Sequence, residues 1–105
     1  MKKNYQAIDE YTSSLKFMKN NEQFHVYINR GLCYREIGKL ESSIDDMTKA
    51  CEISKDNPIA HFQLGVNFLL NFNYDCALEK FNTAIEMDQL EPKFQNYKAL
   101  ALYMN

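Results

Sequence analysis

Residues 57–87 read NPIAHFQLGVNFLLNFNYDCALEKFNTAIEM, and this stretch decides the fold. Asn57 is a good helix N-cap, and Pro58 follows at the first helical position, where its missing N–H removes no hydrogen bond. Asn73, a second cap candidate, separates two runs in which apolar residues recur at helical spacing. The first run comprises Ile59, Phe62, Val66 and Leu69, and the second Tyr74, Ala77, Leu78, Phe81, Ala84 and Ile85. The stretch therefore predicts two amphipathic helices joined by a short turn.

The same pattern occurs once more, earlier in the chain. The shift that aligns Gly31 with Gly65 also aligns Ala50 with Ala84, and most apolar positions between them agree in size and polarity. Gly38 is a suitable residue to end the earlier first helix. A repeat of about 34 residues, as here, is typical of proteins built from stacked helix pairs.

The whole chain is expected to be helical. One further amphipathic helix precedes the two repeated units, and another, opened by Pro92, follows them. Only three glycines and two prolines occur in 105 residues, which favours long helices with short connections. The six predicted helices span residues 3–19, 23–37, 40–54, 58–71, 74–88 and 92–104. The fold class is therefore predicted to be all-α.

Small residues predict where these helices cross. Gly31 and Gly65 lie in the middle of first helices, where glycine costs about 1 kcal/mol relative to alanine. In the second helices small residues recur two helical turns apart, as Ser43 with Ala50, Ala77 with Ala84, and Ala7 with Ser14. We therefore expect tight antiparallel pairs in which a neighbouring helix passes close to the glycine backbone.

These residues resemble the tetratricopeptide repeat, whose first helix has a Trp-like residue, Leu-Gly and Tyr, and whose second has Ala, Phe and Ala. The matching residues are His61, Leu64, Gly65, Phe68, Ala77, Phe81 and Ala84 in one unit, Tyr27, Arg30, Gly31, Tyr34, Ser43, Met47 and Ala50 in the other, and Ala7, Tyr11 and Ser14 in a lone second helix. In the last helix either Ala99 or Ala101 occupies the glycine position. The resemblance implies a right-handed α-solenoid of about two and a half motifs in a single domain over residues 1–105. Its parts would be a lone second-type helix (1–22), two repeats (23–57 and 58–91) and a terminal helix (92–105).

Composition and charge exclude several classes of partner. Twelve Lys and Arg against fourteen Asp and Glu give a net charge of −2, so no large positive field attracts nucleic acid. The three cysteines are far apart in the sequence and away from both histidines, which argues against a zinc site or a disulfide framework. The longest apolar run is only Ala99–Met104, whereas a membrane helix needs about 20 residues. We expect a cytoplasmic protein that needs no cofactor or metal and binds neither nucleic acid nor membrane.

Few residues are candidates for catalysis. No nucleotide-binding, metalloprotease or serine-hydrolase motif occurs. His25 and His61 lie on equivalent first helices, and an aromatic core position explains His61 better than a pH switch does. Asp45 and Asp46 point about 100° apart on a helix, so they cannot share a proton, and we interpret them as part of a solvated face. The sequence therefore predicts no enzymatic activity.

A binding surface remains as the functional candidate. In tetratricopeptide-repeat arrays the first helices line a concave groove where ligands bind, and the resemblance places Ile28, Asn29, Leu32, Arg35, Ile59, Phe62, Gln63, Val66 and Leu69 in it. Most of these residues are apolar, and a large exposed apolar patch indicates an interaction site. We expect a scaffold or adaptor whose groove binds an apolar or amphipathic segment of a partner protein. On this hypothesis Phe62→Glu abolishes binding and leaves the helix pairing intact.

The alternative is a structural array segment or a self-associating unit, whose groove and ends are buried against other repeats or copies of itself. The final helix presents Tyr97, Leu100, Ala101 and Met104, and the first helix presents Ala7, Tyr11 and Ser14, each set without an evident partner. We therefore predict self-association, with a homodimer through one of these helices. One class of ligand is disfavoured, because family members that bind acidic C-terminal peptides use Lys and Asn at the positions that Ile28 and Leu32 hold here.

Overall fold

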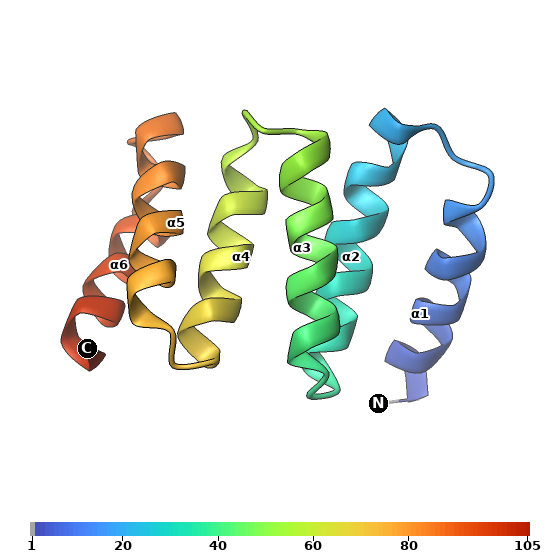
Figure 1. The fold of residues 1–105 in the computed structure, drawn as a ribbon, viewed down its shortest axis with the longest axis horizontal. Coiled ribbons are helices and arrows are strands. Elements are labelled where there is room, and N and C mark those ends of the chain that lie inside the picture. The colour runs from blue at the N-terminus through green and yellow to red at the C-terminus, as the bar shows by residue number, and fades with distance from the viewer. Residues whose placement is uncertain (1) are drawn as a thin grey trace. The chain divides into compact units, whose positions relative to one another are not determined.

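The computed structural model describes residues 2–105, and over that range it contains six α-helices and no strand (Figure 1). The helices are α1 (Lys2–Leu15), α2 (Gln23–Glu36), α3 (Leu40–Ile53), α4 (Pro58–Leu70), α5 (Tyr74–Met87) and α6 (Pro92–Met104), with a 3-10 turn at Asn20–Glu22 before α2. Helices α1 to α3 form one compact unit, which ends at Lys55, and α4 to α6 form a second, which begins at Asp56. We call them unit 1 and unit 2. The prediction of an all-α helical repeat is confirmed.

Five helices begin and end within one residue of the predicted bounds, and α1 is the exception because it ends at Leu15 instead of residue 19. The side-chain amide of Gln23 donates to the carbonyl oxygens of Leu15 (3.2 Å) and Met18 (3.1 Å). The bond to Leu15 satisfies a carbonyl group that the end of a helix leaves without an intrahelical partner, and the bond to Met18 ties the following turn to α2. The cap comes from α2, so the apolar pattern of α1 gives no sign of it. Among residues 2–105, no helix combines the length and the apolarity needed to cross a bilayer.

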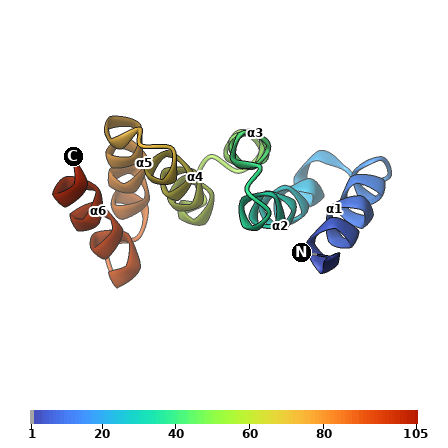
Figure 2. The same cartoon turned by 90° about the horizontal axis from the view of Figure 1, so that it is seen from below.

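Each unit is built on an antiparallel helix pair, α2 with α3 in unit 1 and α4 with α5 in unit 2 (Figures 1 and 2). In unit 1, α1 packs against α2, and in unit 2, α6 packs against α5 and also contacts α4. The main apolar cluster of unit 2 comprises Phe62, Val66, Leu69, Ala77, Phe81, Ala84, Phe94 and Ala101. The third helix of unit 2 thus contributes two residues to the same core as the helix pair.

The glycines mark the closest approach within each pair. A Cβ atom added to Gly65 would lie 2.7 Å from Cε1 of Phe81 and 3.2 Å from Cβ of Lys80. One added to Gly31 would lie 2.9 Å from Cε of Met47, which is as fully buried as Phe81. Real Cβ atoms do not approach other atoms so closely, so the predicted close crossing is confirmed in both units.

Unit 1 also contains an ion pair that unit 2 lacks. Nε and NH2 of Arg30 donate to the two carboxylate oxygens of Asp46 at 2.8 and 2.7 Å, and Asp46 is almost fully buried. Arg30 NH1 donates to the hydroxyl of Thr12 at 3.1 Å, so one guanidinium joins α1, α2 and α3. The interpretation of Asp46 as a solvated residue is therefore wrong, because its carboxylate is the partner of a cation on the facing helix. At the equivalent positions of the repeat, unit 2 has Leu64 and Lys80.

The turns inside the two helix pairs share one backbone conformation but differ in sequence. Gly38 ends the α2–α3 turn with a φ of 81°, a left-handed conformation that glycine adopts without a steric penalty. Phe72, at the equivalent position of the α4–α5 turn, has a φ of 61°, and its side chain is exposed. A non-glycine residue in this region carries about 1–2 kcal/mol of strain.

We predict that Gly65→Ala destabilises the chain more than Gly31→Ala does. The new methyl group at position 65 meets the rigid ring of Phe81, whereas at position 31 it meets the flexible end of Met47. Overpacking costs about 1–3 kcal/mol, and the higher helix propensity of alanine returns about 1 kcal/mol. Chemical denaturation followed by circular dichroism should give a lower unfolding midpoint for Gly65→Ala than for Gly31→Ala. Equal midpoints would contradict the difference between the two crossings.

We also predict that Asp46→Ala lowers the free energy of unfolding by about 2–3 kcal/mol, because it leaves the Arg30 guanidinium without its carboxylate. The double variant Arg30→Leu with Asp46→Lys installs the residues that unit 2 has at these positions and should restore most of the loss. The same denaturation measurement on both variants decides the point. A double variant as unstable as Asp46→Ala would show that the ion pair cannot be replaced by the leucine and lysine that unit 2 has at these positions.

Candidate protein-binding surface

The structure places four of the predicted groove residues in the interior. Ile28, Phe62, Val66 and Leu69 are all buried, and the last three belong to the apolar cluster of unit 2. The ring of Phe62 is 5% exposed and lies 5.0 Å from the ring of Phe94 and 5.1 Å from that of Tyr97, measured between ring centres. Helix α6 therefore covers the face of α4 that was expected to bind a partner. Phe62 is a core residue, so a charge at this position would disrupt the packing of unit 2.

The other five predicted groove residues keep part of their surface. Ile59 and Asn29 are exposed, and Leu32, Arg35 and Gln63 are half-buried. Arg35 and Gln63 already interact with other groups of the chain. The predicted groove face that remains accessible on the first helices therefore has fewer apolar side chains than the sequence predicts.

The structure determines the register of the last helix. Asn57 and Glu91 both cap a helix that begins with proline, and their side chains accept a hydrogen bond from the backbone N–H of Ile59 (2.9 Å) and Lys93 (3.2 Å). The two prolines are separated by one repeat length, the distance between Gly31 and Gly65, and both helices have 13 residues. Helix α6 is therefore a first-type helix, which means that it corresponds to the first helix of a repeat, as α2 and α4 do; α1, α3 and α5 are second-type helices. In α6 the place of Gly65 is held by Ala99 and not by the buried Ala101.

This register changes the surface that α6 offers. Tyr97, predicted for self-association, is half-buried because its ring packs against Phe62 and Phe81. Leu100 and Met104 are exposed as predicted, and so is Tyr103. Leu100, Tyr103 and Met104 correspond to Val66, Leu69 and Leu70 of α4, which the resemblance assigns to the groove, although Val66 and Leu69 are themselves buried. Sequence reasoning missed Tyr103, although the spacing of the two prolines would have located it.

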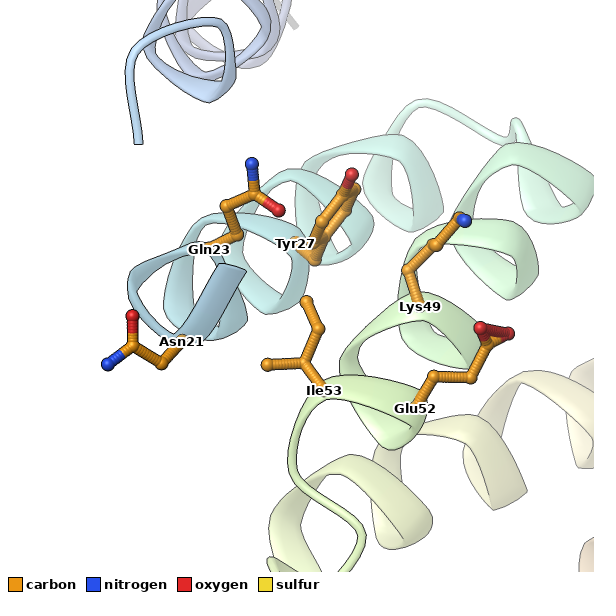
Figure 3. Close-up of a pocket in the computed structure, with 6 residues that line it drawn as sticks. All are labelled: Asn21, Gln23, Tyr27, Lys49, Glu52 and Ile53. Atoms are coloured by element: carbon orange, nitrogen blue, oxygen red, sulfur yellow. The ribbon is translucent and has the colours of Figure 1, made fainter. Parts of the chain in front are cut away.

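A shallow hollow in unit 1 is a second candidate site. Figure 3 shows its lining, which consists of Asn21, Gln23, Tyr27, Lys49, Glu52 and Ile53. The residues come from the 3-10 turn, α2 and α3, and their polar groups point outward around an open surface (Figure 3). The lining contains neither histidine nor cysteine. It offers no nucleophile with an adjacent base, and nothing in its geometry indicates chemistry.

Two titratable groups of unit 1 have shifted pKa values, and both shifts have structural causes. The hydrogen bonds to Asp46 raise the pKa of Arg30 above its ordinary value, although burial opposes the change. Burial raises the pKa of the Cys33 thiol, and the carboxylate of Glu36 adds to the effect. The shift favours the thiol form of Cys33, which is less reactive than the thiolate. Over residues 2–105, no group of three His, Cys, Asp or Glu side chains lies close enough together to hold a metal ion.

Comparisons with known proteins agree with the repeat found here. The tetratricopeptide-repeat family model matches residues 24–57. Over 71 residues, 68% of this chain and 23% of the relative, the chain is 32% identical to the lipoprotein NlpI homolog of Haemophilus influenzae. The chain spans less than a quarter of the length of the curated relatives it matches.

Solved structures share the fold at low sequence identity. The first tetratricopeptide-repeat domain of Spaghetti (RPAP3), bound to the HSP90 peptide SRMEEVD, has a TM-score of 0.89 at 18% identity, covering 96% of this chain and 79% of that one. The tetratricopeptide-repeat domain of Arabidopsis OM64 has a TM-score of 0.86 at 23% identity, covering 95% and 81%. The helix pairs, their glycine crossings and these matches together show that the chain belongs to the tetratricopeptide-repeat family.

Proposed function

We propose that this chain is a non-catalytic adaptor of the cytoplasm, and that unit 2 binds an apolar or amphipathic segment of another protein along α4 and α6. The observation that carries the proposal is a set of exposed apolar side chains at groove positions of these two helices. The set comprises Ile59 and Leu70 on α4 and Leu100, Tyr103 and Met104 on α6. Tyr103, at 88% exposure, is the most accessible of them. A contiguous exposed apolar patch on a soluble protein indicates an interaction site.

The residue types fit recognition of a helical or extended peptide. Tyr103 provides a large, rigid contact with a polar tip, and Met104 adapts to irregular surfaces. Ile59, which is half exposed at the start of α4, adds a branched apolar contact. Such a mixture favours an amphipathic ligand.

The likeness to a peptide-bound domain supports peptide binding as the use of this fold. The Spaghetti domain is bound to the acidic peptide SRMEEVD. The resemblance identifies two positions at which family members recognise an acidic C-terminus. In this chain those positions hold Ile28, which is buried, and Leu32, which is half-buried. Neither side chain donates a hydrogen bond to a carboxylate, so we propose a different class of peptide as the ligand.

Selection of a random peptide library on the immobilised chain tests this function. The selected peptides should have apolar residues at helical or alternating spacing, and Ile59→Lys or Tyr103→Lys should weaken their binding at least about tenfold, which is about 1.4 kcal/mol. Leu90→Lys is the matched control, because Leu90 is 91% exposed but lies in the α5–α6 turn. Fluorescence titration measures each affinity.

Two results would contradict the proposal. The first is binding that survives both substitutions on α4 and α6 or that falls equally with Leu90→Lys, because the ligand would then bind elsewhere. The second is binding of SRMEEVD that is as tight as that of any selected peptide, because the chain would then recognise acidic C-termini without the expected cationic groups.

A further inference from the structure

We propose that two copies of this chain associate head to tail, with α6 of one copy and α1 of the next forming one complete tetratricopeptide repeat. The occupant of each face is thus a second copy of the chain. Helix α6 is a first-type helix and α1 is a second-type helix, and in each the face that normally meets the other half of the repeat is open. This interface does not use the peptide-binding residues, although Ala99 lies one helical turn from Tyr103 on α6.

The two complete repeats show what the open face of α1 normally contacts. In α3 and α5 the positions equivalent to Ala7, Tyr11 and Ser14 are all fully buried against a first-type helix, as Ser43, Met47 and Ala50 and as Ala77, Phe81 and Ala84. In α1 the same positions are incompletely covered, since Ala7 and Tyr11 are half-buried and Ser14 is exposed. The face therefore has the small–large–small pattern of a repeat, and no helix among the described residues fully covers it.

Helix α6 has the complementary pattern. Its register places Lys98, Ala99 and Leu102 where α4 has Leu64, Gly65 and Phe68 and where α2 has Arg30, Gly31 and Tyr34. Ala99 and Leu102 are exposed, whereas Gly31 and Gly65 are buried beneath Met47 and Phe81. Position 99 holds an alanine, one methyl group larger than the glycines of the complete repeats, so its crossing with Tyr11 has to be wider than the crossings at Gly31 and Gly65.

Charge complementarity identifies α1 as the partner of α6. In unit 1, Arg30 precedes the crossing glycine and pairs at 2.7 Å with Asp46, which precedes Met47. In the composite repeat the equivalent residues are Lys98, before Ala99, and Glu10, before Tyr11. Lys98 and Glu10 therefore occupy the two positions whose residues form the ion pair of unit 1. An α6–α6 contact would instead bring together two helices whose only charged side chains, Lys93 and Lys98, are cationic.

The contact is heterologous, so each association leaves one α1 face and one α6 face open. The association therefore continues beyond a dimer as the concentration rises, unless the chain of contacts closes on itself. It also weakens with salt, because the Lys98–Glu10 pair lies near the surface.

Sedimentation velocity of the full chain and its variants tests the proposal. Ser14→Arg and Ala99→Arg each block one face at an exposed position, and each should reduce the association constant at least about tenfold. The controls are Ser13→Arg and Asn96→Arg, which place the same charge at exposed positions on other faces of α1 and α6 and should associate like the parent chain. Circular dichroism confirms that each variant is folded.

Mixing the two blocked variants distinguishes this contact from a symmetric one. Ser14→Arg keeps its α6 face and Ala99→Arg keeps its α1 face, so the mixture should form a heterodimer of one copy each and stop there. Carbodiimide treatment of mixed isotope-labelled and unlabelled parent chain should join Lys98 to Glu10 between copies, as read by mass spectrometry. A monomeric parent chain at high concentration, or a mixture that stays monomeric, would overturn the proposal. So would one blocked variant that still forms dimers by itself.

Discussion

The close approach of two helices at a glycine is the constraint on which the rest of this structure depends. At Gly65 the backbone of α4 comes so near to Phe81 that an added Cβ atom would lie 2.7 Å from its ring, and at Gly31 an added Cβ atom would lie 2.9 Å from the more flexible end of Met47. The crossing determines which face of each first helix meets its partner and, by helical geometry, which faces remain for other contacts. Because both units place these residues at the same spacing along the sequence, the same division of faces recurs in both.

The faces left by the crossing account for both proposed interactions. In unit 2, α6 covers Phe62, and Phe94 and Tyr97 complete the aromatic cluster. The groove positions that α6 itself carries stay exposed, and Tyr103 among them is available to a peptide. Ala99 lies one helical turn from Tyr103, and we propose that it meets a second-type helix together with Lys98 and Leu102. The two proposed interactions would thus use different but neighbouring residues of one helix.

Much of the fold could be predicted from the sequence because its signals are local and repeated. The caps, the turn residues and the two glycines lie within the segments they control, so helix bounds and crossings followed directly. The end of α1 could not be predicted, because its cap comes from Gln23 on another helix. The burial of Phe62 depends on α6, and the pairing of Arg30 with Asp46 depends on the facing helix. Neither can therefore be predicted from the apolar pattern of a single helix. The left-handed conformation of Phe72 is indicated only by its alignment with Gly38.

Nuclear magnetic resonance of the Gly65 α-protons tests the central constraint most directly. If the ring of Phe81 lies against the α4 backbone, as the 2.7 Å approach to an added Cβ requires, these protons should show strong nuclear Overhauser effects to that ring. Their chemical shifts should also move away from the random-coil value because of the ring current, and the Phe81→Leu variant should remove that displacement. Random-coil shifts together with the absence of any Overhauser effect to Phe81 would contradict the crossing, and with it the division of faces that follows from it.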